Sequence, residues 1–103
     1  MEHRWSLRKP VCLDALVLHR LSGLMPATVR DISLEGVFIT VEYPALPSLA
    51  LVELSFALAA DDKRAIQQTE AFVIHQTRNG YGLMFKNFRQ SAFQVLKDVL
   101  YAA

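Results

Sequence analysis

The sequence DISLEG at residues 31–36 combines the end of one predicted strand with a tight turn into the next. A short polar stretch that ends in glycine, between two apolar runs, is typical of a β-hairpin. We expect Gly36 to take the positive φ that a short hairpin turn often needs. Asp31 and Ser33 are two residues apart on the predicted strand, so their side chains should share one face while Ile32 points into the core.

The strand pattern continues on both sides of this hairpin. Before it, the apolar residues from Val11 to Val17 alternate and fall on one face. After it, alternation recurs from Val52 to Leu58, and the pair Asn79-Gly80 predicts a second hairpin. We expect strands over residues 11–20, 26–33, 36–43, 50–58, 64–77 and 81–86.

The period of the apolar residues changes to helical spacing near the C-terminus and predicts an α-helix over about residues 89–101. Six short antiparallel strands in one small domain most easily close into a barrel, because closure removes exposed edges. We therefore predict a mainly β fold, a six-stranded antiparallel β-barrel with a C-terminal α-helix. Residues 1–10 form an N-terminal arm and residues 11–103 form the barrel and helix of a single domain, with no internal repeat.

The composition restricts the possible functions. The chain has 103 residues, a net charge of +1, 52% hydrophobic residues and 20% charged residues. These values indicate a globular protein without the broad basic surface that grips long nucleic acids. Any anion site must therefore be local. Cys12 is the only cysteine, which allows no internal disulfide, and we expect it to be a small buried residue in a strand.

The first residues carry no apolar signal segment, and the most apolar region, residues 43–60, is interrupted by prolines and polar residues. We therefore expect a cytoplasmic protein without membrane insertion, present as a monomer or a homodimer.

A second motif lies in the N-terminal arm. RWSLR at residues 4–8 places Arg4 and Arg8 on one side of the backbone, whether that backbone is helical or extended. Arginine binds phosphate oxygens and the guanine O6/N7 edge, and it stacks on base faces. The Asp31 carboxylate can accept the N–H groups of a guanine edge, with the Ser33 hydroxyl beside it. Alternatively, Asp31 and Ser33 cap the turn through local hydrogen bonds.

Together the two motifs resemble the PilZ domain family, whose members typically bind cyclic di-GMP. The family pattern is RxxxR near the N-terminus followed by [D/N]xSxxG, and residues 4–8 and 31–36 match it at every defining position. The sequence GYGLMF at residues 80–85 is also similar to the final strand of the family. The resemblance spans nearly the whole chain.

The resemblance implies a bacterial cyclic di-GMP receptor that signals to a partner protein still to be identified. It assigns Arg4 and Arg8 to phosphates and guanine, Asp31 and Ser33 to the guanine edge, and Gly36 to the shape of the hairpin. His3, Lys9 and Arg30 flank the motifs and are candidates for additional contacts. The alternative is a protein-interaction adaptor that does not depend on the nucleotide.

The sequence gives little support to an enzyme. His3, His19 and His75 lack the spacing of metal ligands, so we expect no catalytic residue, no metal and no cofactor apart from the nucleotide ligand. Tyr81, Phe85 and Phe88 could form a stacking platform for single-stranded nucleic acid, but ordinary core packing explains them better. We therefore expect no nucleic-acid partner.

Overall fold

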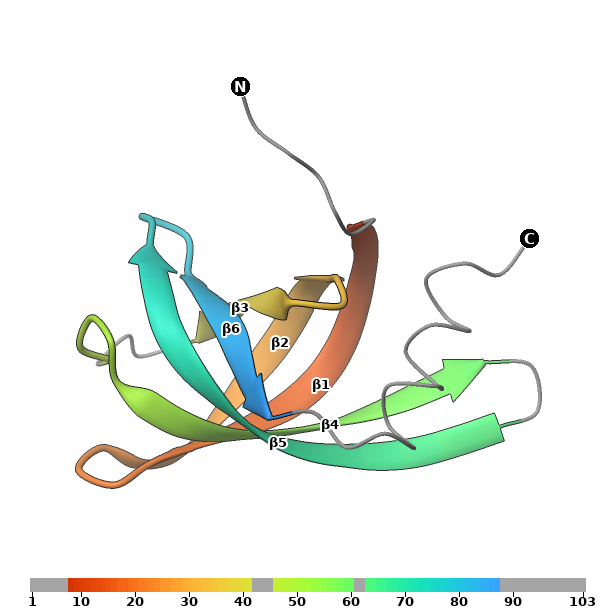
Figure 1. The fold of residues 1–103 in the computed structure, drawn as a ribbon, viewed down its shortest axis with the longest axis horizontal. Helices are drawn as coiled ribbons and strands as arrows, with labels where there is room; N and C mark the ends of the chain where they lie inside the picture. The colour runs from red at the N-terminus through yellow and green to blue at the C-terminus, as the bar shows by residue number, and fades with distance from the viewer. Residues whose placement is uncertain (1–7, 42–45, 61–62, 88–103) are drawn as a thin grey trace.

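Six antiparallel strands close into a barrel (Figure 1). The structure is a computed structural model that describes residues 8–41, 46–60 and 63–87. Each predicted strand is present, with ends that differ from the predicted ones by a few residues. The predicted helix over residues 89–101 lies outside the described residues. The strands are β1 (Lys9–His19), β2 (Gly23–Ile32), β3 (Gly36–Val41), β4 (Leu51–Ala60), β5 (Lys63–Gln76) and β6 (Tyr81–Asn87).

The strand order around the barrel is β1-β2-β3-β6-β5-β4, with β4 pairing back onto β1. Strands that are neighbours in the barrel are also consecutive in the sequence, except for β3 with β6 and β1 with β4. Because β1 runs antiparallel to β2, the start of β1 lies beside the end of β2, with Lys9 opposite Ile32 and Pro10 opposite Asp31. The N-terminal arm therefore enters the barrel next to the hairpin at residues 31–36.

The core follows the predicted alternation. Val17, Val29, Ile39, Leu54 and Val73 are fully or almost fully buried and point into the barrel. Burial of these aliphatic side chains is the main stabilising contribution in a domain of this size.

Cys12 lies on β1 as predicted but is exposed, so the expected burial of its thiol is wrong. Its neighbours Val11 and Leu13 are partly buried and pack against the core. Side chains alternate along a strand, so a residue between these two must point outward. The thiol is exposed because Val11 and Leu13 face the core and Cys12 lies between them. This alternation outweighs the general preference of cysteine for buried positions.

The barrel contains a structural repeat that the sequence does not reveal. In the β2–β3 hairpin, Asp31 pairs with Phe38 and Val29 with Ile39, and a bulge separates the two pairs. In the β5–β6 hairpin, His75 pairs with Gly82 and Val73 with Leu83, again across a bulge. Residues 27–41 thus correspond one to one with residues 71–85, although the aligned segments share only Ala, Val and Gly at 27/71, 29/73 and 36/80.

The pairing of β3 with β6 makes this repeat symmetric. Phe38 pairs with Gly82 in the middle of the ladder, and Val37 and Ile39 on β3 pair with Leu83 and Tyr81 on β6. If each residue is replaced by its equivalent in the other hairpin, the same three pairs are obtained. The pairing is therefore that expected for two hairpins related by a twofold axis through the Phe38–Gly82 pair. The repeat is therefore one of strand pairing, which the sequence, with only three shared residues in the aligned segments, does not show.

Gly36 and Gly80 occupy equivalent positions in the two hairpins, and each is needed for a close backbone contact. A Cβ atom on Gly36 would overlap the carbonyl oxygen of Leu83, and a Cβ atom on Gly80 would overlap that of Ile39. Among the described glycines only Gly23 has a positive φ, so the expected positive φ at Gly36 is wrong. Glycine is required there because β6 passes too close for any side chain.

We predict that Gly36→Ala and Gly80→Ala each lower the free energy of unfolding by about 1–3 kcal/mol, because each added methyl group must push two strands apart. Gly82→Ala is the matched control, since its Cβ would lie 3.3 Å from the His75 Cβ and needs only a small adjustment. Urea denaturation followed by circular dichroism measures all three. Equal stability of the Gly36→Ala variant and the wild type would contradict the steric explanation.

Candidate functional site

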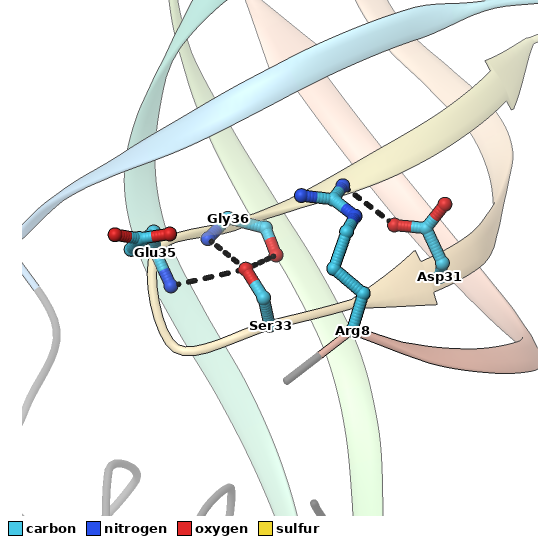
Figure 2. A network of polar contacts seen from close by, with 5 residues as sticks. All are labelled: Arg8, Asp31, Ser33, Glu35 and Gly36. Carbon is cyan, nitrogen blue, oxygen red and sulfur yellow. Dashed lines mark hydrogen bonds and ion pairs between the residues drawn. The ribbon is translucent and has the colours of Figure 1, made fainter. Parts of the chain in front are cut away.

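Arg8 and Asp31 form an ion pair at the point where the arm enters the barrel (Figure 2). The Arg8 Nη2 donates to Asp31 Oδ1 at 2.7 Å, and the two side chains are 42% and 32% exposed. A charge-assisted bond of this length fixes the direction of the guanidinium. The structure thus brings together one residue from each of the two sequence motifs.

Ser33 is 1% exposed and its hydroxyl is used within the turn. The Oγ accepts hydrogen bonds from the backbone N–H groups of Glu35 and Gly36, both at 3.2 Å, and donates to the carbonyl of Gly36 at 3.3 Å (Figure 2). One donor and two acceptor positions are all that a hydroxyl offers. The turn-capping interpretation therefore describes the local contacts of Ser33.

Ser33 does not share an exposed face with Asp31. The strand β2 ends at Ile32, so Ser33 no longer follows the alternation of a strand. Ile32 is fully buried as predicted, Ser33 is buried as well, and only Asp31 of the three remains partly exposed. The predicted common face fails because the chain is already turning at residue 33.

The same turn occurs a second time in the chain, at Thr77–Gly80. The Thr77 Oγ1 accepts from the N–H groups of Asn79 and Gly80, both at 3.1 Å, and the Thr77 N–H donates to the Gly80 carbonyl at 2.8 Å. In the first turn the corresponding Ser33 N–H donates to the Gly36 carbonyl at 2.9 Å. The hydroxyl and glycine of the DxSxxG motif thus recur at a place where the chain has no arginine-bearing arm.

The remaining predicted site residues are placed as follows. Gly36 is buried against β6, as described above. Lys9 is half-buried on β1, and Arg30 is exposed at the bulge of β2. His3 and Arg4 lie outside the described residues, so their roles stay predictions.

A hollow of about 300 Å³ adjoins Arg8. Its wall includes Glu35 and Gly36 from the turn and Gly82 and Met84 from β6, with Ile74 from β5. The main chain of Glu35 is fixed here, because the N–H of Phe85 donates to its carbonyl at 2.8 Å. The sequence motifs did not identify Glu35, Ile74 or Met84 as site residues. Ile74 and Met84 are exposed apolar residues on two different strands. The sequence alone does not indicate that they lie beside the motifs, because this depends on the strand register.

Other candidate chemistry finds little support in the part of the chain that the structure describes. No group of three or more His, Cys, Asp or Glu residues among 8–41, 46–60 and 63–87 is arranged to hold a metal ion. Tyr81 is buried and its hydroxyl accepts from the Leu46 N–H, and Phe85 packs against the core. These two residues therefore form no exposed stacking platform, and Phe88 lies outside the described residues.

The comparison with protein families agrees with the paired motifs and the barrel. The family model described as PilZ domain matches residues 2–102. The chain belongs to the PilZ domain family. Searching the curated proteins gives no significant match to this PilZ domain. No helix among its described residues is both long and apolar enough to span a membrane.

Two solved structures share the fold of this PilZ domain. The first is the Bacillus subtilis inhibitor of motility MotI/DgrA, with a TM-score of 0.80 and 16% identity over 93% of this chain. This PilZ domain spans 48% of that protein's length. The second is the PilZ domain of CeSA from a cellulose-synthesizing bacterium, with a TM-score of 0.62, 15% identity, and coverage of 91% of this chain and 94% of the other.

We predict that Ser33→Ala destabilises the PilZ domain by about 1–2 kcal/mol, because it leaves two turn N–H groups without their acceptor at a buried position. Thr77→Ala removes the same contacts at an exposed turn, where water can replace the lost acceptor, and should cost less. Thr77→Ser should retain the stability of the wild type, because it keeps the hydroxyl and removes only a methyl group at an exposed position. Thermal and urea denaturation of the three variants give the comparison. A stable Ser33→Ala protein would contradict a turn-building role for the hydroxyl.

Proposed function

We propose that this PilZ domain is a cyclic di-GMP receptor that binds its ligand between the N-terminal arm and the hairpin at residues 31–36. The observation that carries the proposal is the Arg8–Asp31 pair beside the hollow of about 300 Å³. Family membership supports it, since binding of cyclic di-GMP is typical of PilZ domains. In this proposal Arg4 joins Arg8 at the ligand, with His3, Lys9 and Arg30 as candidates for further contacts.

The ion pair leaves both of its members able to act on a ligand. A guanidinium has five N–H donors, and only the donor at Nη2 is directed at Asp31. A carboxylate has about four acceptor positions, so the second Asp31 oxygen can accept the N–H groups of a guanine edge. The pair therefore holds Arg8 ready for phosphate or for the guanine O6/N7 edge before any ligand arrives.

The bound receptor then signals to a partner protein in this proposal. Contact between the ligand and the arm changes the surface that lies next to the hairpin, and a partner that prefers one form reports the messenger. The structural neighbour MotI/DgrA is named an inhibitor of motility, which gives one example of a regulator built on this barrel.

We predict that calorimetric titration with cyclic di-GMP gives saturable heat with the wild type. Arg8→Ala and Asp31→Ala should each weaken binding by at least about tenfold, because each removes a charge-assisted contact. Arg78→Ala is the matched control, since this exposed arginine lies in the equivalent turn of the other hairpin and should leave affinity unchanged. Absence of heat from the wild type at millimolar ligand would overturn the proposal.

The second candidate function is a protein-interaction adaptor that does not use the nucleotide. Exposed apolar side chains on the outer face of β1 and β2 favour it, because Leu18 and Leu24 pair across the two strands and are 42% and 63% exposed. Exposed apolar surface of this kind is typical of interaction sites.

We predict that a partner protein is retained differently with and without cyclic di-GMP in a pull-down, and that Arg4→Ala/Arg8→Ala removes the difference. Leu18→Ser serves as the comparison, because it changes the apolar face while leaving the arm intact. Equal retention by the wild type and the double arginine variant under both conditions would favour the adaptor over the receptor.

A further inference from the structure

The outer surface of the β1–β2 hairpin carries exposed apolar side chains near its turn. Leu16 and Leu18 on β1 pair with Pro26 and Leu24 on β2, and all four side chains point outward. The three leucines are 46%, 42% and 63% exposed in sequence order, and Leu21 in the turn is 85% exposed. We call these five residues the apolar face. Exposed apolar side chains gathered in this way are typical of a surface that another molecule covers.

A hollow of about 330 Å³ borders the apolar face. Leu18 pairs with Glu53 on β4, and Glu53 pairs with Glu70 on β5, so one row of side chains runs from a leucine to two carboxylates. Arg20 and Leu51 line the same hollow. Two like charges directly opposite each other on neighbouring strands are unfavourable, so a cation placed between them would be stabilising.

The charged groups at this hollow are only partly paired. Glu70 forms an ion pair with Lys86 at 3.7 Å. Arg20 and Glu53 are both exposed, and within residues 8–41, 46–60 and 63–87 neither of them has a hydrogen bond or an ion pair through its side chain. The surface therefore presents one guanidinium and one carboxylate that are free to bind outside groups, beside an apolar face.

This combination of groups indicates that the surface fits a second copy of the chain. In a symmetric dimer the same patch of each copy faces the other, so every contact between two different residues forms twice. Such a patch needs charges of both signs around an apolar centre, and this surface has them in Arg20, Glu53 and the apolar face. An anionic lipid surface fits poorly, because Glu53 and Glu70 would repel it.

We propose that this PilZ domain forms a symmetric homodimer through the apolar face. The apolar faces of the two copies cover each other, and Arg20 of each copy enters the hollow of the other. There the guanidinium donates to the Glu53 carboxylate, a pairing in which two parallel hydrogen bonds can form. The aliphatic part of the arginine packs on Leu18 and Leu51. Each hollow is therefore completed by a residue from the other copy.

The dimer is independent of the proposed function. The Arg8–Asp31 pair lies where β1 begins, and the apolar face lies toward the other end of β1, where the strand turns into β2 (Figure 1). The two copies can therefore cover their apolar faces while Arg8 and Asp31 of each copy stay accessible.

We predict that sedimentation velocity of the wild type shows a monomer–dimer equilibrium between micromolar and millimolar concentrations. Arg20→Glu and Glu53→Arg should each weaken dimerisation by at least about tenfold, because each places like charges opposite each other across the interface. An equimolar mixture of the two variants should restore a dimer, since every charge pair in the mixed dimer then joins opposite charges. Arg78→Glu is the matched control, because it makes the same change of charge in an exposed turn outside the hollow.

A second pair of variants tests the apolar part of the interface. Leu24→Ser should weaken dimerisation by about tenfold, because it removes an apolar side chain that the other copy buries. Ile66→Ser should leave dimerisation unchanged, since Ile66 is 79% exposed on β5 outside the apolar face. Circular dichroism checks that each variant keeps the β fold.

The outcomes decide the proposal without cyclic di-GMP, so failure of the proposed function and failure of the dimer are separate results. A wild type that stays monomeric at millimolar concentration overturns the dimer and leaves the apolar face to a different protein. A dimer that both charge reversals leave unchanged overturns it too, because its interface then lies elsewhere. If a charge variant fails to fold, the comparison of Leu24→Ser with Ile66→Ser decides.

Discussion

The close approach of β3 and β6 is the constraint on which the site depends. It needs glycine at residues 36 and 80, because the carbonyls of Leu83 and Ile39 occupy the space of a side chain. The contact holds the 31–36 turn against the end of β6, where the Phe85 N–H donates to the Glu35 carbonyl. Because of it, the turn has a fixed place beside β1 and the entering arm. Arg8 pairs with Asp31 there, and Arg8 and Glu35 line the same hollow.

The Arg8–Asp31 pair contributes to position more than to stability. Exposed ion pairs are worth about 0.2–1 kcal/mol, since water screens the charges and two long side chains lose freedom. Burial of the barrel core contributes far more. An ion pair at 2.7 Å with both side chains about one-third to two-fifths exposed therefore orients a guanidinium that remains accessible to a ligand. The weakness of the pair in water is compatible with rearrangement when a phosphate competes for the same donors.

Much of the fold could be predicted from the sequence, because alternation along each strand is a local property. The six strands and their inward faces follow from residues such as Val17, Val29 and Leu54, and the barrel follows from the number of strands. The burial of Ser33, the conformation of Gly36 and the exposure of Cys12 were not predicted correctly. The burial of Ser33 depends on the residue at which β2 ends. The conformation of Gly36 depends on β6, which is far away in the sequence. The exposure of Cys12 depends on which residues of β1 face the core.

The site was predictable only where its chemistry coincides with a motif. Arg8 and Asp31 stand in recognisable patterns, but Glu35, Gly82 and Met84 come together only through the pairing of β3 with β6. The repeat separates two kinds of motif residue. Ser33 and Gly36 have counterparts in Thr77 and Gly80 that build the same turn at the opposite end of the ladder, so these two positions serve the scaffold. At the positions of Asp31, Glu35 and Phe38 in the β2–β3 hairpin, the β5–β6 hairpin has His75, Asn79 and Gly82. The two hairpins share their pairing register and their turn hydrogen bonds, so they differ in these replacements and in Arg8, which pairs with Asp31.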